Sequence, residues 1–288
     1  MITFLIAHLC TNSTISRSTA VDQIQTVVAR LTKCQLPPPA YLYRPENYLV
    51  PAQELYKIDT SSLVYTARNY QLHDPALTDL GFGTQCDELA RFLENDVPLA
   101  QKIDLIVVSP MRRTLQTAQQ GLGWLIKRGV PVILRPEWQE NSDKPCDTGT
   151  PIELMAKEWP QFDWSTVDPL FPEKSGIYGY SKAALTERGI TARKWLQQRP
   201  EKVIAVVSHS AFLRTCISYR HYANADYRIF DFADGDGQTN AELVEWEVTE
   251  SRGGGLGKSP KGVFGMTIND YPKEIVEDIG EATSEVPN

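Results

Sequence analysis

The sequence predicts an α/β fold with a mostly parallel central sheet and helices on both faces of that sheet. Two β-branched apolar runs, Ile103 to Val108 and Val203 to Val207, are typical of strands buried in a parallel sheet. Longer amphipathic stretches alternate with short apolar runs from Tyr41 to about Thr249, as expected when helices cover a sheet. At 288 residues the chain is long enough to bury a substantial core.

Each of these two strands ends in a polar residue that leads into a helical pattern. Ser109 follows the first strand and Ser208 the second, and open α/β sheets place their sites at the carboxyl ends of strands. A short strand is predicted over Val132 to Leu134, and Glu242 to Val248 alternates like a closing edge strand. Helical spacing is found in three stretches, Met111 to Leu125, Thr150 to Lys157 and Tyr180 to Gln198.

We divide the chain into three parts. Residues 1–40 hold a helical pattern, Val21 to Leu31, and end near the breaker Leu36-Pro37-Pro38-Pro39, so they predict a variable N-terminal appendage. Residues 41–250 form the functional domain. Residues 251–288 start with the Gly-rich run Ser251 to Gly257 and predict a flexible tail.

The net charge of −7 argues against nucleic acid or an anionic membrane as a partner, because no broad basic field exists to gather phosphates. Five scattered cysteines without a CxxC pair favour a reducing, cytoplasmic compartment and predict neither disulfides nor a zinc site. The opening run Met1 to Cys10 is too short to span a bilayer. We expect no cofactor and no metal.

The segment Ser109 to Ala118 places Arg112 and Arg113 where a strand turns into a helix. An oxyanion there would meet Ser109, the N–H groups of the first helical turn and a bidentate guanidinium. A solvated helix start is the alternative interpretation of the two arginines.

Two further segments carry titratable groups after predicted strands. His209 and Ser210 follow Val203 to Val207, and a histidine there could bind an oxyanion and titrate near neutrality. Glu140 follows the short third strand and could serve as a general acid. A histidine bonded to backbone and a surface carboxylate are the alternatives.

In this order and spacing, the three segments resemble the histidine phosphatase superfamily, the phosphoglycerate mutase-like proteins, and especially its small fungal members. The resemblance covers about residues 45–250 and implies a phosphoglycerate mutase-like fold with a phosphate pocket. By position, Arg113 is similar to the family's phosphate-binding arginine, His209 to its second histidine and Glu140 to its proton donor. Other matching stretches are His73 to Gly81, Lys144 to Gly149 and Asn240 to Glu242.

The sequence departs from this family at the first motif, Arg-His-Gly or Arg-His-Ala, whose histidine carries the phosphoryl group. The expected place is Tyr48 to Gln53, where Pro51 stands instead of Arg-His. A second register, Leu63 to Arg68, also lacks the pair. A third, Phe4 to His8, has a histidine after a strand but no arginine. A misplaced exon boundary before Ala52 is an alternative account of the missing pair.

These observations leave three hypotheses open. The first is a phosphoglycerate mutase-like enzyme acting on a small anionic metabolite, a phosphate or a carboxylate, without ordinary phosphatase activity. The second is a catalytically inactive relative that binds an anion or a partner. The third is a serine hydrolase with Ser210 as nucleophile, which is disfavoured because Phe212 is bulky where a nucleophile elbow needs a small residue. The resemblance to fungal members implies a role in secondary metabolism.

Overall fold

The computed structural model describes residues 2–8, 70–233 and 240–265. Within them a six-stranded sheet has the order β3-β2-β4-β1-β5-β6. The strands are β1 (Ile2–His8), β2 (Leu105–Val108), β3 (Val132–Leu134), β4 (Val203–His209), β5 (Tyr227–Phe232) and β6 (Leu243–Glu245). The α-helices are α2 (Cys86–Asp96), α3 (Arg112–Gly121), α4 (Gly123–Lys127), α5 (Ile152–Glu158), α6 (Lys182–Gln197), α7 (Ser210–Phe212) and α8 (Glu247–Glu250).

Short helical turns complete the described segments. Two are π-helical, Leu80–Gln85 before α2 and Leu213–Ile217 after α7. Four are 3₁₀ turns, Ala100–Lys102, Pro136–Trp138, Pro145–Asp147 and Gly176–Tyr178. The 3₁₀ turns at Pro136 and Pro145 each start with proline, whose fixed φ suits the first helical position.

The sheet is parallel where the predicted strands lie. β2 pairs in parallel with both β3 and β4, so that Val108 stands beside Leu134 on one side and Val207 on the other. All seven residues of β4 and all four of β2 are buried, as expected for strands covered on both faces. The predicted α/β fold is confirmed, with β5 and β6 forming an antiparallel pair at the far edge.

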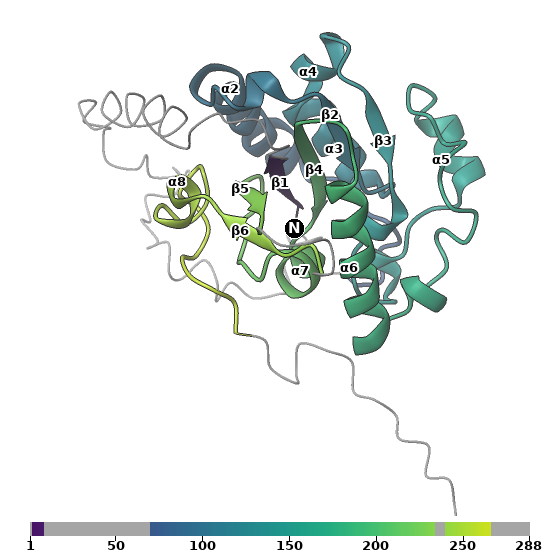
Figure 1. Cartoon of the computed structure of the whole chain (residues 1–288). Coiled ribbons are helices and arrows are strands. Elements are labelled where there is room, and N and C mark those ends of the chain that lie inside the picture. Colours follow the sequence, from purple (N-terminus) through teal and green to yellow (C-terminus); the bar gives the residue numbers. More distant parts are fainter. Residues whose placement is uncertain (1, 9–69, 234–239, 266–288) are drawn as a thin grey trace, which may run out of the picture.

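Helices cover both faces of this sheet (Figure 1). Side chains alternate along each strand, so Ile106 and Val108 of β2 pack with α2, α3 and α4 on one face. Leu105 and Val107 pack with α6, Phe212 and the π-helical turn on the other face. Within the described residues, no helix combines the length and apolar character needed to cross a membrane.

Most predicted elements match the structure to within a few residues. The helix predicted over Met111 to Leu125 is two helices, α3 and α4, because Leu122 between Gly121 and Gly123 leaves the helical conformation at φ −121° and ψ 12°. The predicted closing strand is shorter, since β6 ends at Glu245 and α8 follows. The helix predicted over Val21 to Leu31 lies outside the described residues.

The first strand corrects the prediction of an N-terminal appendage. β1 lies inside the sheet, between β4 and β5. It runs antiparallel to β4, with Ile2 opposite His209 and His8 opposite Val203. At about 3.3 Å per residue, the backbone of His8 is roughly 20 Å from that of His209. His8 therefore cannot supply the histidine missing beside His209, and the other two registers, Tyr48 to Gln53 and Leu63 to Arg68, lie outside the described residues.

The beginning of the predicted flexible tail is packed against the domain. Gly253, Gly254 and Gly255 are buried, and Ser259 donates to the buried carboxylate of Asp226 at 2.5 Å. A Cβ on Gly255 would lie 2.0 Å from the Tyr227 ring. The glycines thus allow a close approach to β5, and the prediction of a flexible tail is wrong for residues 251–265.

Candidate functional site

The carboxyl ends of β2 and β4 bring two predicted site residues into contact. The Ser109 N–H donates to the Val207 carbonyl at 3.0 Å, which continues the parallel pairing beyond the last residue of β2. Ser109 Oγ then lies 3.0 Å from His209 Nε2, and both residues are fully buried. Because β2 and β4 run parallel and end at the same edge of the sheet, Ser109 and His209 come into contact although they are 100 positions apart in the sequence.

Burial decides the protonation of His209. Burial, and then the positive charge of Arg113, hold the pKa of His209 well below its usual range. The neutral ring accepts at one nitrogen and donates at the other. When Ser109 donates to Nε2, the ring proton lies on Nδ1, which is buried without a partner among the described residues.

Arg113, in the first turn of α3, is held by the loop that follows Glu140. Its Nη1 donates to the Cys146 carbonyl at 2.7 Å, and its Nη2 forms an ion pair with Asp147 Oδ1 at 3.3 Å. Asp147 also accepts a 2.5 Å hydrogen bond from Ser142 through Oδ2. The guanidinium is nearly buried and close enough to affect the pKa of His209, so it belongs to the same cluster.

Glu140 is brought to this cluster by the turn Pro136–Trp138 after β3. Its Oε1 accepts the N–H groups of Asn141 and Phe212, each at 3.0 Å. Because Phe212 is in α7, directly after His209, this carboxylate lies beside the end of β4. Among the described residues no hydrogen bond engages Oε2, which leaves that oxygen available to exchange a proton.

Arg188 of α6 contacts the loop that carries Glu140. The Arg188 side chain is fully buried and its Nη2 donates to Asn141 Oδ1 at 3.1 Å. Its guanidinium also lies 4.4 Å from the centre of the Phe212 ring, a cation–π geometry. Burial lowers the pKa of Arg188 to about 10. Arg188 therefore remains charged at neutral pH, and it contacts both the Glu140 loop and the Phe212 ring of α7.

Arg112 and Ser210 make other contacts than those expected of anion ligands. Arg112 forms a bidentate ion pair with Glu158 of α5 at 2.9 and 2.7 Å, and this bond is the main cause that raises its pKa. Its Nη1 donates to the Asp74 carbonyl at 2.8 Å. Ser210 Oγ donates to the Tyr222 carbonyl at 3.4 Å. His209 Nε2 faces Ser109 instead, so the structure does not pair Ser210 with a base.

The sequence reasoning did not identify Lys174 or Arg188 as part of this cluster. Lys174 lies in the loop before α6, and its Nζ donates to the Glu140 carbonyl at 2.7 Å. A lysine in a Pro- and Gly-bearing loop has no periodicity that would predict burial. Arg188 occupies an apolar position of α6 among Leu185 and Ala192, and this placement in the pattern was the one available signal.

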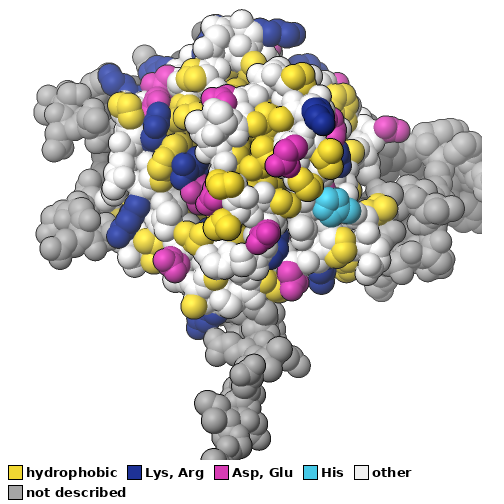
Figure 2. Space-filling view, turned by 90° about the vertical axis from the view of Figure 1, so that its right-hand side faces the viewer, with side chains coloured by type: hydrophobic (Ala, Val, Ile, Leu, Met, Phe, Trp, Pro, Cys, Tyr) yellow, Lys and Arg dark blue, Asp and Glu magenta, His cyan; other side chains and the backbone are white. Residues whose placement is uncertain are grey.

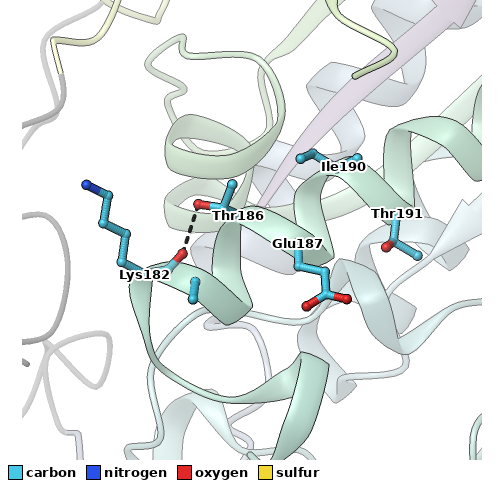
Figure 3. A pocket seen from close by; sticks show the side chains of 6 residues that line it. Lys182, Thr186, Glu187, Ile190 and Thr191 are labelled. Atoms are coloured by element: carbon cyan, nitrogen blue, oxygen red, sulfur yellow. Dashed lines mark hydrogen bonds between the residues drawn. The ribbon is translucent and has the colours of Figure 1, made fainter. Parts of the chain in front are cut away.

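Two depressions elsewhere on the described surface lack such convergent charges. A shallow depression of about 450 Å³ runs along the outer side of α6, and Figure 3 shows Thr186 bonded to the Lys182 carbonyl within that helix. A second depression of about 420 Å³ adjoins it beside Arg193. On the face in Figure 2, acidic and basic side chains are interspersed. None of the predicted site residues lines either depression.

The chain is similar to one protein family and to several known proteins. The family model of the histidine phosphatase superfamily (branch 1) matches residues 64–252. A probable phosphatase of Schizosaccharomyces pombe is 35% identical over 147 residues, which cover 49% of this chain and 65% of that protein. A phosphoglycerate mutase-like protein of Arabidopsis thaliana is 28% identical over 184 residues, covering 54% of this chain and 65% of that protein. The chain thus spans about 65% of the length of either relative.

Proposed function

Because the chain belongs to branch 1 of the histidine phosphatase superfamily, we propose that it binds a small anionic metabolite, a phosphate or a carboxylate, between Arg113, His209 and Glu140. The observation that carries this proposal is the Nδ1 of His209, which is buried and has no partner among the described residues. A buried N–H without an acceptor costs about 1–3 kcal/mol. An oxyanion oxygen would remove that cost and would also accept from Arg113.

His209 and Arg113 would both contact the bound anion. Neutral His209 donates one hydrogen bond from Nδ1, with Ser109 holding the ring in its tautomer at 3.0 Å. Arg113 supplies charge and a planar pair of donors. For this, its Nη2 would exchange the 3.3 Å contact with Asp147 for the ligand. Glu140 offers Oε2 as the group that exchanges a proton with the bound metabolite.

We also propose that ordinary phosphatase activity is absent. A phosphohistidine route needs a nucleophilic histidine beside His209, and the chain has four histidines. His8 is opposite Val203 at the other end of the strand. His73 Nε2 contacts the Gly149 carbonyl at 3.1 Å, and the ring of His221 packs edge-on against Phe264 at 4.7 Å. Phosphate-monoester hydrolysis has one of the highest uncatalysed barriers, which a site without a nucleophile does not lower enough.

The alternative function is that of a catalytically inactive relative that binds the same anion without converting it. The specific observation in its favour is the absence of Arg-His at Tyr48 to Gln53. Both functions require the anion site, and they differ in turnover. Saturable conversion of any small anionic substrate that depends on Glu140 favours the enzyme. Binding that is indifferent to Glu140→Gln, with no conversion, favours the inactive relative.

Thermal unfolding in the presence of phosphate tests the anion site. Ligand at about 100 times Kd stabilises by about 2.7 kcal/mol, which gives a clear rise in Tm. We expect this rise to disappear in Arg113→Ala and in His209→Ala. Arg112→Ala is the matched control, because the neighbouring guanidinium is engaged with Glu158, and it should retain the rise whatever its own Tm.

A hydrolysis assay tests the second part of the proposal. The protein should hydrolyse an aryl phosphate no faster than Arg113→Ala does. The anion site is refuted if phosphate leaves the Tm of the wild type unchanged, or if both variants keep the rise. An Arg113-dependent rate together with a trapped phosphohistidine would show that ordinary phosphatase activity is present.

A further inference from the structure

Asp74 is a fully buried residue that the proposed function does not use. Its Oδ1 accepts the N–H of Arg112 at 3.1 Å, and its Oδ2 accepts the N–H of Thr150 at 3.1 Å. The Asp74 N–H donates to the Pro145 carbonyl at 3.2 Å. This one residue therefore connects the start of α3 with both ends of the loop formed by residues 145–150.

The two parts of the chain that Asp74 connects are the parts that determine where the Arg113 guanidinium lies. Arg113 is in the first turn of α3. Its Nη1 donates to the Cys146 carbonyl at 2.7 Å, and its Nη2 forms an ion pair with Asp147. Both acceptors belong to the loop 145–150. A displacement of this loop relative to α3 would therefore separate the guanidinium from the groups that orient it.

The carboxylate of Asp74 also serves as a cap for α3 from a distant part of the chain. Met111, the residue before the helix, provides no side-chain cap. A carboxylate at the start of a helix is stabilised by the free N–H groups and by the helix dipole. Because Asp74 occupies the N–H of Arg112, an entering anion meets the side chains of Arg113 and His209 and not this N–H.

Contacts on both sides hold the segment around Asp74 in place. The φ angle of Asp74 is 38°, in the left-handed region, which is unfavourable for most residues other than glycine but is tolerated by aspartate. On one side, His73 Nε2 contacts the Gly149 carbonyl at 3.1 Å. On the other side, the Leu77 N–H donates to Gln116 Oε1 of α3 at 2.7 Å. The segment thus has a fixed position between α3 and the loop 145–150.

We propose that Asp74 is a positioning residue for the anion site, which keeps α3 and the loop 145–150 together and so fixes the Arg113 guanidinium before the anion arrives. This inference rests on the proposed function. A side chain that is already ordered does not lose its freedom when the ligand binds, and the affinity is higher for that reason. Asp74 acts through Arg113, makes no contact with the anion and forms no covalent bond.

Calorimetric titration of Asp74→Asn with inorganic phosphate tests this role. Asparagine keeps the size of the side chain, but its amide nitrogen cannot accept a hydrogen bond, so one of the two N–H groups loses its partner. At a temperature at which the variant is folded, we expect its Kd for phosphate to be about tenfold higher than that of the wild type or more, as the loss of a hydrogen bond between charged groups predicts.

Asp104→Asn is the matched control, because it makes the same change in a carboxylate with the same kind of contacts. Asp104 accepts the N–H groups of Lys202 and Val203, each at 2.9 Å. These contacts lie at the start of β4, roughly 20 Å along the strand from His209. We expect Asp104→Asn to bind phosphate as the wild type does. Unchanged phosphate affinity in a less stable Asp74→Asn, or an equal loss of affinity in Asp104→Asn, would overturn the inference.

Amide hydrogen exchange of the wild type provides a second test, which decides the question if Asp74→Asn does not fold. The N–H groups of Arg112 and Thr150 should exchange slowly without any ligand, because Asp74 already accepts from both. Slow exchange that appears only in the presence of phosphate would show that the ligand orders this region, and would overturn the inference. Failure of the wild type to bind phosphate at all, with both N–H groups protected, would refute the proposed function itself.

Discussion

Replacing Lys174 with methionine should stabilise the folded protein, and should do so more at neutral than at alkaline pH. The pKa of this lysine falls from 10.5 to about 7 on folding. A folded pKa below the unfolded one means that the unfolded chain holds the proton more tightly. Stability therefore rises with pH between these two values, and the protonated lysine works against folding below them. Methionine has nearly the same length and no proton to lose.

The magnitude follows from the two pKa values. The difference between 10.5 and about 7, at about 1.4 kcal/mol per pKa unit, makes the full penalty about 5 kcal/mol below pH 7. As the pH approaches the unfolded pKa, the penalty declines to about 3 kcal/mol at pH 8 and about 2 kcal/mol at pH 9. Loss of the hydrogen bond from Lys174 Nζ to the Glu140 carbonyl subtracts about 1 kcal/mol at every pH.

Urea unfolding of wild type and Lys174→Met at about pH 7, 8 and 9 measures this effect. We expect the free energy of unfolding of the variant to exceed that of the wild type, and the excess to shrink by about 2 kcal/mol across this range. Other titrating groups are common to both proteins and cancel in the difference. Lys127→Met, which replaces an exposed lysine of α4, is the control and should differ from the wild type by the same small amount at each pH. A pH-independent difference for Lys174→Met would refute the reasoning.

Two further predictions concern the packing of residues 251–265 against β5. Asp226→Ala removes a buried carboxylate that accepts three hydrogen bonds, so it should lower the free energy of unfolding by about 3 kcal/mol; an unchanged urea midpoint would show that this segment does not contribute to stability. Gly255→Ala should cost about 2 kcal/mol, because its Cβ would meet the Tyr227 ring at 2.0 Å. The control Gly123→Ala, in α4 with no atom within 4 Å, should be neutral or stabilising, and equal effects for both would contradict the close packing.

The parallel part of the sheet could be predicted from the sequence because its signals are local. Runs of β-branched residues fix the strands, and the polar residues directly after them lie at one edge once the strands pair in parallel. Ser109 and His209 therefore meet as the pattern indicates. Glu140, which follows β3, also lies near the end of the strand that carries His209, where its carboxylate accepts the Phe212 N–H. This local pattern did not distinguish Arg113 from Arg112, since both stand at the helix start. Tertiary contacts separate them, because Arg112 pairs with Glu158 and Arg113 with Asp147.

The remaining features depend on contacts between residues far apart in the sequence. The apolar run Ile2–His8 predicts a strand, but its position between β4 and β5 and its reversed direction are set by pairing across about two hundred residues. The glycines after Ser251 predict flexibility locally, whereas close packing on Tyr227 needs the same absence of side chains. Lys174 has an ordinary loop context and acquires its low pKa only from burial among the groups that the fold gathers around Glu140. Sequence patterns determined which strands and chemical groups were available, and tertiary burial decided which of those groups carry charge, because desolvation and neighbouring charges act through space.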